Sequence, residues 1–168
     1  IDPVLKLDLR RKLRVIQKEL KITMIYVTHD QHEALTFADS VTIMDHGRIV
    51  QTASPEELFL NPRTPFVGYF IGSPGMNMMR CNDGRIAGSE LRLPEALRKK
   101  ADGLGGSAEM GIRPEFVETS SDPREGWDPM TVESVDHSGA FQVLTLASGE
   151  VRLKAKVDDA FLSKKSGT

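Results

Sequence analysis

The periodicity of the sequence changes near residue 72, and this change limits the folds that are open to the chain. Before it, stretches with the helical spacing of apolar residues alternate with short apolar runs, which is the pattern of an α/β domain. After it, short strand-like segments are separated by turn signals, and 11 of the 14 glycines lie there. The sequence therefore predicts an α/β part, residues 1–72, followed by a small β-rich, OB-like part, residues 73–168.

The first 38 residues predict a helix, a strand and a second helix. Asp2 can cap a helix that has Pro3 at its first position, and apolar residues recur every three or four positions to about Lys21. The charged residues between them are predicted to form a solvated face. The run 23–27 is apolar and rich in β-formers, which is typical of a parallel strand buried on both faces. A second helical pattern covers 31–38.

Turn and helix-capping residues predict a hairpin and two short helices in the rest of the first part. Segments 40–44 and 49–53 predict a hairpin, with Gly47 free to take a positive φ in the turn between them. Ser54-Pro55 and Thr64-Pro65 each combine an N-cap residue with proline at the first helical position, so each predicts a short helix.

In the second part the sequence predicts about five short strands and one helix. The helix is expected at 94–100, and the clearest strand patterns lie at 85–87, 130–136, 141–147 and 151–157. Short strands with irregular connections indicate a small barrel of the OB type.

The composition does not identify a function, but it argues against a few classes of protein and of site. A formal net charge of -2 and a pI near 6.1 give no global basic field for nucleic acid or anionic lipid. The single cysteine, Cys81, cannot form an internal disulfide and is expected to be a small buried residue. No apolar run approaches the roughly 20 residues that cross a bilayer. Neither end of the sequence shows residues that would clearly begin or end a domain, so we expect the chain to be a piece of a longer protein.

His29 is the candidate functional residue because it follows the predicted buried strand 23–27. The C-terminal ends of strands in an α/β sheet face the ligand crevice. A lone histidine is, however, more often structural than catalytic, and position alone does not separate the two roles. His32 lies three residues further on, but no recognisable ligand spacing completes a metal site, so none is expected.

Several segments, taken in order, resemble the ATP-binding subunits of ABC importers, in particular the maltose and glycerol-phosphate branch. They are Met24 to Gln31, Glu33 to Asp39, Asp45 to Gln51, Pro55 to Phe59, Phe70 to Asn77 and Gly111 to Glu115. Each is weak alone, whereas the ordered set is highly specific. The resemblance implies that the chain is the C-terminal part of such a subunit, from the D-loop onward, with an OB-like (TOBE-type) regulatory domain that lacks its final strands.

The resemblance also implies roles for two residues. His29 would be the switch histidine that contacts the γ-phosphate of ATP. An imidazole held at a strand end can donate a hydrogen bond to the negative charge that develops on the phosphate oxygens. Asp2 would be the D-loop aspartate at the interface between two ATPase subunits, although Ile1 stands where leucine is usual. The chain has no GxxxxGK[ST] loop, signature motif or carboxylate-bearing strand. ATP and Mg²⁺ are therefore expected to bind only the full-length parent, and this chain alone is predicted to be inactive.

The implied partners are a second copy of the subunit, membrane-embedded permease subunits and a regulatory protein on the C-terminal domain. The implied location is the cytoplasmic face of the inner membrane, as a peripheral protein. One alternative is that the OB-like part is a ligand-sensing or regulatory binding module without catalysis. A nucleic-acid-binding OB fold is disfavoured because only Trp127 and Phe141 could stack on bases, and basic residues are scattered.

Overall fold

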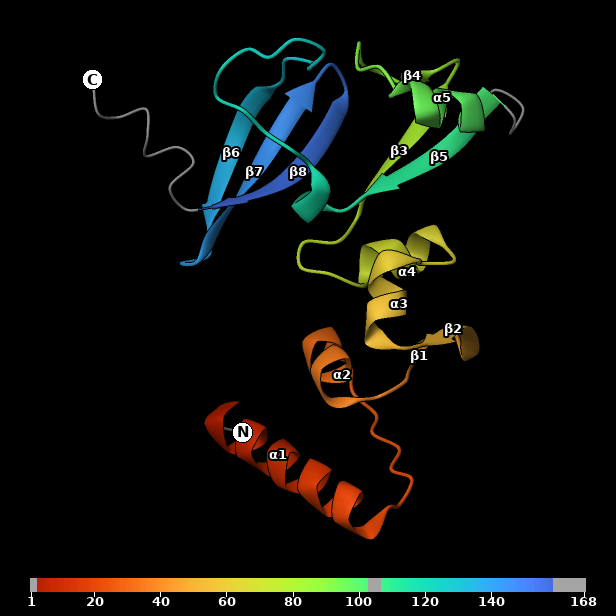
Figure 1. Ribbon diagram of the computed structural model, residues 1–168, viewed down its shortest axis with the longest axis vertical. Coiled ribbons are helices and arrows are strands. Elements are labelled where there is room, and N and C mark those ends of the chain that lie inside the picture. The colour runs from red at the N-terminus through yellow and green to blue at the C-terminus, as the bar shows by residue number, and fades with distance from the viewer. Residues whose placement is uncertain (1–2, 103–106, 159–168) are drawn as a thin grey trace. The chain divides into compact units, whose positions relative to one another are not determined.

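A computed structural model describes residues 3–102 and 107–158 of the chain. The chain divides into two compact units, Ile1–Ile71 and Gly72–Thr168 (Figure 1). The first unit is mixed α and β, and the second is built mainly from antiparallel strands. In the described ranges, no helix is both long and apolar enough to cross a membrane.

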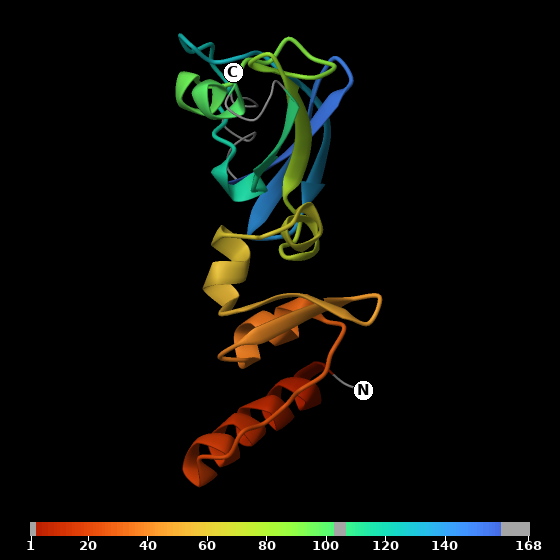
Figure 2. The same ribbon diagram turned by 90° about the vertical axis from the view of Figure 1, so that its right-hand side faces the viewer.

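The first unit begins with the long helix α1, Pro3–Leu20, which has proline near its start as the sequence predicts. After α1 the chain turns and returns to α2, Gln31–Phe37, which lies against the N-terminal half of α1 (Figure 2). The antiparallel hairpin β1, Val41–Asp45, and β2, Arg48–Ala53, follows. His46 and Gly47 both have positive φ in its two-residue turn.

Two capped helices complete this unit. They are α3, Pro55–Leu60, and α4, Pro65–Phe70. The Ser54 side chain accepts a hydrogen bond from the Glu57 backbone, and the Thr64 side chain accepts one from Val67, which confirms both predicted N-caps. The core of the unit lies between the hairpin and the helices that follow it and has five buried members: Val41, Ile43, Leu58, Val67 and Ile71.

One expectation for this unit is wrong. Residues 22–28 form no strand, and Ile25 and Val27 are 88% and 90% exposed. A parallel strand needs neighbouring strands for its backbone groups, and the described residues offer none to this segment. Helix α1 is found as predicted, and Leu5, Leu9 and Leu20 on it are exposed. Charged side chains of α1 contact α2: Lys6 and Arg10 meet Glu33, and Arg14 meets the Phe37 carbonyl.

The described residues of the second unit form two three-stranded antiparallel sheets with the orders β4-β3-β5 and β6-β7-β8. The first sheet comprises β3, Asn77–Asn82, β4, Arg85–Ile86, and β5, Ser107–Ile112. The second comprises β6, Thr131–His137, β7, Phe141–Ser148, and β8, Val151–Asp158. Helix α5, Glu95–Asp102, and the short 3-10 helix η1, Pro114–Phe116, lie on the connections.

Both sheets contribute to one core. Its buried residues include Met79 and Cys81 from β3, Leu144 and Leu146 from β7, and Ala155 from β8. Cys81 is buried as expected, and burial raises the pKa of its thiol. The predicted strands at 85–87, 130–136, 141–147 and 151–157 are found within one residue or two at either end. Strands β3 and β5 were not predicted.

Candidate functional site

His29 lies at the junction between the extended segment 22–28 and helix α2. Its side chain is exposed, and within the described part of the chain it makes no hydrogen bond or ion pair. The imidazole is therefore available to a ligand, whereas the residues on both sides of it are held in place.

Asp30 fixes the chain on one side of His29. Its carboxylate caps α2 by accepting hydrogen bonds from the backbone N–H groups of His32, at 2.9 Å, and Glu33, at 3.1 Å. The hydrogen bond from the Glu33 backbone, reinforced by that from His32, lowers the pKa of the Asp30 carboxyl below its ordinary value.

Thr28 fixes the chain on the other side. Its Oγ1 accepts a hydrogen bond from the backbone N–H of Asp30, at 3.0 Å, and so closes a tight turn around His29. The same hydroxyl lies 3.0 Å from Oε2 of Glu33 and donates its proton to that carboxylate. His29 is thus bracketed by two side chains, both of which are engaged with the start of α2.

Glu33 is a buried carboxylate in the first turn of α2, with 6% of its surface exposed. Its Oε1 lies 2.6 Å from a guanidinium nitrogen of Arg10 and 3.9 Å from Nζ of Lys6, both on α1. Its Oε2 accepts hydrogen bonds from Thr28 and from the phenol of Tyr26, at 3.2 Å. Burial, and then this hydrogen bond, raise the pKa of Tyr26.

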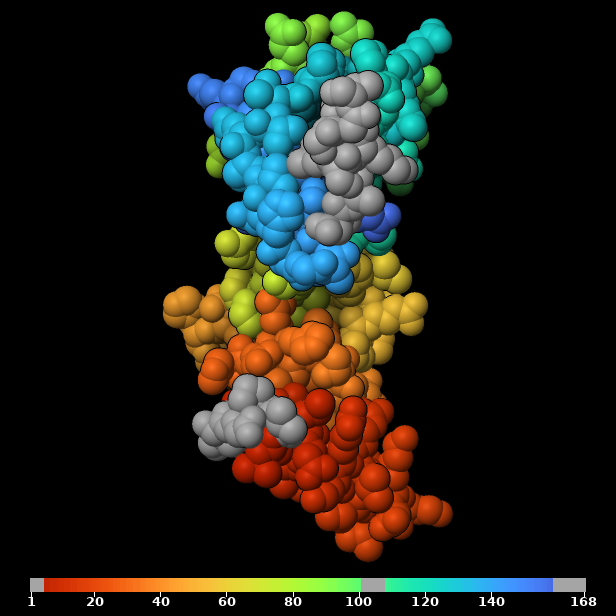
Figure 3. Space-filling view, turned by 90° about the vertical axis from the view of Figure 1, so that its left-hand side faces the viewer, coloured from red at the N-terminus to blue at the C-terminus, as the bar shows by residue number. Residues whose placement is uncertain are grey.

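A second basic side chain attaches α1 to the end of α2. Arg14 donates a hydrogen bond to the backbone carbonyl of Phe37 and lies 3.3 Å from Oδ1 of Asp39. The basic residues of α1 were expected to form a solvated face, but Arg10 and Arg14 join it to α2. Figure 3 shows α1, in red, and α2, in orange, meeting in one continuous surface.

His29 and Asp2 are the two predicted site residues, and the structure describes His29. Asp2 lies outside the described residues. The side chains of Arg10, Thr28 and Glu33 had no assigned role. Glu33 could have been detected from the sequence, because it is a carboxylate within the apolar pattern of a short helix. Its neighbours Ala34 and Leu35 pack on the core. Its partner Arg10 lies 23 positions away and could not be identified from spacing.

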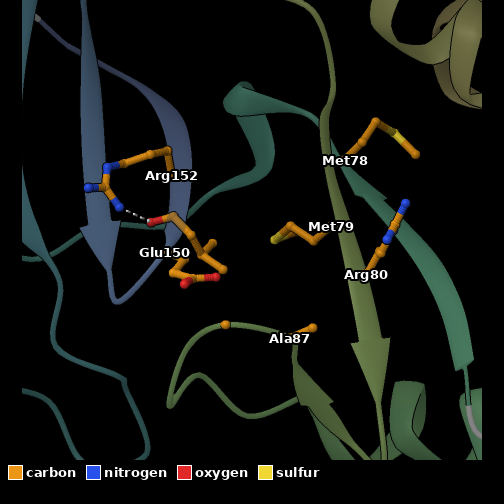
Figure 4. A pocket seen from close by; sticks show the side chains of 8 residues that line it. Met78, Met79, Arg80, Ala87, Glu150 and Arg152 are labelled. Carbon is orange, nitrogen blue, oxygen red and sulfur yellow. Dashed lines mark hydrogen bonds between the residues drawn. The ribbon is translucent and has the colours of Figure 1, made fainter.

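The described residues include no cluster of three or more histidine, cysteine, aspartate or glutamate side chains suited to a metal ion. An open hollow occurs in the second unit (Figure 4) and is lined by Met78, Met79, Arg80, Ala87, Gly88, Glu150, Val151 and Arg152. Its Arg152 donates to Glu133, at 2.7 Å, and to the carbonyl oxygens of Gly149 and Val151. That guanidinium is therefore already engaged and does not indicate an anion site.

Comparison with known proteins gives a consistent set of relatives, although no protein-family profile matches the chain. The sn-glycerol-3-phosphate import ATP-binding protein of Rhizobium meliloti is 40% identical over 155 residues, 89% of this chain and 42% of that protein. The sulfoquinovosyl glycerol transport ATP-binding protein of Agrobacterium fabrum is 34% identical over 166 residues, 94% of this chain and 45% of that protein.

An uncharacterized ABC transporter ATP-binding protein of Bacillus subtilis is 32% identical over 172 residues, 94% of this chain and 47% of that protein. The chain thus spans less than half the length of these relatives.

Proposed function

Because this chain is related over most of its length to the ATP-binding proteins of ABC importers, we propose that it is the C-terminal part of such a subunit. The full-length protein would couple ATP hydrolysis to the uptake of a sugar or sugar phosphate. The observation that carries this proposal is the 40% identity over 155 residues to a glycerol-phosphate import protein. ATP and Mg²⁺ would be held largely by parts of the subunit that this chain does not contain.

We propose that His29 acts on the γ-phosphate of ATP in that subunit. Its imidazole is exposed and unengaged within the described residues, while Thr28 and Asp30 restrain the backbone on either side. Phosphoryl transfer spreads negative charge over the phosphate oxygens, so a restrained donor at this position would stabilise the transition state more than the bound substrate. Asp2 would contact the second subunit of a dimer.

The exposed apolar surface of the first unit supports its assignment as part of a larger domain. Ile25 and Val27 are almost fully exposed, and the apolar side of α1 is open as well. Exposed apolar patches are typical of places where another protein surface packs. Residues 1–72 would thus be the C-terminal part of the nucleotide-binding domain, with this surface covered by the remainder of that domain.

Residues 73–168 would form an OB-like, TOBE-type regulatory domain. Two small antiparallel sheets around one core are compatible with that class. The subunit would work as a homodimer bound to membrane-embedded permease subunits on the cytoplasmic face of the inner membrane. A regulatory protein would act through the second domain.

The test uses the full-length subunit assembled with its permease in lipid vesicles. Wild-type protein should hydrolyse ATP in step with solute uptake, and glycerol phosphates and disaccharides should be tried as solutes. His29→Ala should lower the single-turnover rate by about 100-fold to 1,000-fold with little change in ATP affinity. Full hydrolysis by a folded His29→Ala variant would remove His29 from the mechanism. No ATP hydrolysis by the wild-type assembly would overturn the function itself and favour a binding module.

A further inference from the structure

Glu33 makes two sets of contacts through its two carboxylate oxygens. Oε1 faces α1, where it meets Arg10 at 2.6 Å and Lys6 at 3.9 Å. Oε2 faces the segment before His29, where it accepts from Tyr26 and Thr28. We propose that Glu33 is a positioning residue that couples α1 to His29, an inference that rests on the proposed role of His29.

The contact with α1 is strong and sheltered from water. Glu33 has 7% of its side chain exposed and Arg10 has 15%. A charge-assisted hydrogen bond of 2.6 Å in such a place is about twice as strong as a neutral one, and loss of one partner leaves a buried charge uncompensated. A displacement of α1 therefore carries Glu33 with it.

Two hydroxyls join Glu33 to the segment before His29, and that of Thr28 lies next to His29 itself. Oγ1 of Thr28 donates to Glu33 and accepts from the backbone N–H of Asp30, so one atom joins the carboxylate to both neighbours of His29. Asp30 is in turn fixed by the N–H of Glu33. The backbone on both sides of His29 is thus linked to α1 by a chain of polar contacts.

The link between α1 and His29 would matter when two subunits form a dimer. Helix α1 begins at Pro3, directly after Asp2, the residue proposed to meet the second subunit. A shift of α1 when the two subunits approach would reach His29 through Arg10, Glu33 and Thr28. Glu33 would then align the imidazole only when α1 is in place.

The test uses the full-length subunit with its permease in vesicles and measures single-turnover hydrolysis, the KM for ATP and the melting temperature. Glu33→Gln removes the charge that holds Arg10 while keeping a side chain of the same size. We expect kcat to fall about tenfold, the size typical of couplings between residues in contact, with KM unchanged. Glu95→Gln, which breaks the exposed Glu95–Lys99 pair of α5, is the matched control and should leave both constants unchanged.

Thr28 supplies a second, independent pair of variants. Thr28→Val keeps the shape of the side chain but removes the hydroxyl, and it should lower kcat as Glu33→Gln does. Thr28→Ser restores the hydroxyl and should restore most of the rate. Equal rates for the Val and Ser variants would overturn the proposal even if Glu33→Gln proved unstable.

The decisive measurement combines Glu33→Gln with His29→Ala. If Glu33 acts through His29, adding Glu33→Gln to His29→Ala should cause no further loss of rate. A full additional tenfold loss in the double variant would show that Glu33 acts elsewhere and would overturn the coupling. A wild-type rate for His29→Ala alone would instead show that the proposed role of His29 has failed, a result distinct from either outcome at Glu33.

Discussion

The side-chain amide of Asn77 pairs with both backbone groups of Lys154. Its Nδ2 donates to the Lys154 carbonyl oxygen and its Oδ1 accepts from the Lys154 N–H, each at 2.8 Å. Asn77 begins β3 and Lys154 lies in β8, so one side chain continues hydrogen bonding from the first sheet of the second unit to the edge of the other. A primary amide carries both donor and acceptor atoms, so this one side chain satisfies the N–H and the C=O of the same residue.

Asn77→Ala should destabilise the chain by about 1–2 kcal/mol, because each neutral hydrogen bond contributes about 1 kcal/mol and water can partly replace these exposed ones. Urea unfolding measures the change. Asn82→Ala, at the other end of β3, is the control, since the Asn82 side chain makes no hydrogen bond within the described residues. Equal losses for the two variants would show that the paired amide adds nothing.

Gly149→Ala should destabilise the chain more than Gly139→Ala. Both glycines have positive φ, so both variants incur the cost of a left-handed residue, about 1–2 kcal/mol. A Cβ on Gly149 would also collide with the carbonyl oxygen of Gly88, whereas one on Gly139 meets none of the described residues within 4 Å. Denaturation midpoints of the two variants measure the difference, and indistinguishable midpoints would contradict the close approach.

The cap of α2 should weaken in acid. The pKa of Asp30 is lowered in the fold, so its ionised form contributes stability that is present above the ordinary aspartate value of about 3.9. That contribution is lost as the pH falls through the lower folded pKa. Asp30→Asn keeps a capping side chain without a titrating group. Thermal melts from pH 7 to pH 3 should show a steeper acid decline for the wild type than for Asp30→Asn.

The 168-residue chain alone should neither bind nor hydrolyse ATP to a measurable extent. Its sequence has no phosphate-binding GxxxxGK[ST] loop, and backbone N–H groups of such a loop supply most of the contacts to nucleotide phosphates. Calorimetry with Mg²⁺ and ATP is the measurement. Micromolar binding to this chain would show that it holds a nucleotide site which its sequence does not reveal.

Local signals predicted the elements that depend on neighbouring residues. Ser54 and Thr64 cap helices, and Gly47 forms the hairpin turn, because each of these interactions is completed within three residues. Strands β3 and β5 were missed because neither has a clear alternation: Met78 and Met79 are consecutive, and β5 contains the small residues Ser107, Ala108 and Gly111. Their pairing depends on residues about 30 positions apart.

The candidate site was predicted only in outline. The place of His29 at a boundary before a helix follows from the pattern of apolar residues, but the contacts that restrain it do not. Glu33 meets Arg10 across 23 positions, and no periodicity links the two. The strand expected at 23–27 requires neighbours that the described chain does not provide, so apolar character alone was insufficient to place it in a sheet.

The two hydrophobic cores differ in the length of sequence over which their members are spread. In the first unit, every member of the core lies between Ala34 and Ile71. In the second, the core joins residues from Met79 to Val157, so its N- and C-terminal strands must meet across most of the unit. Chain closure over short separations is faster. During synthesis from the N-terminus, the first core is complete once Ile71 has left the ribosome, while the second must wait for β8.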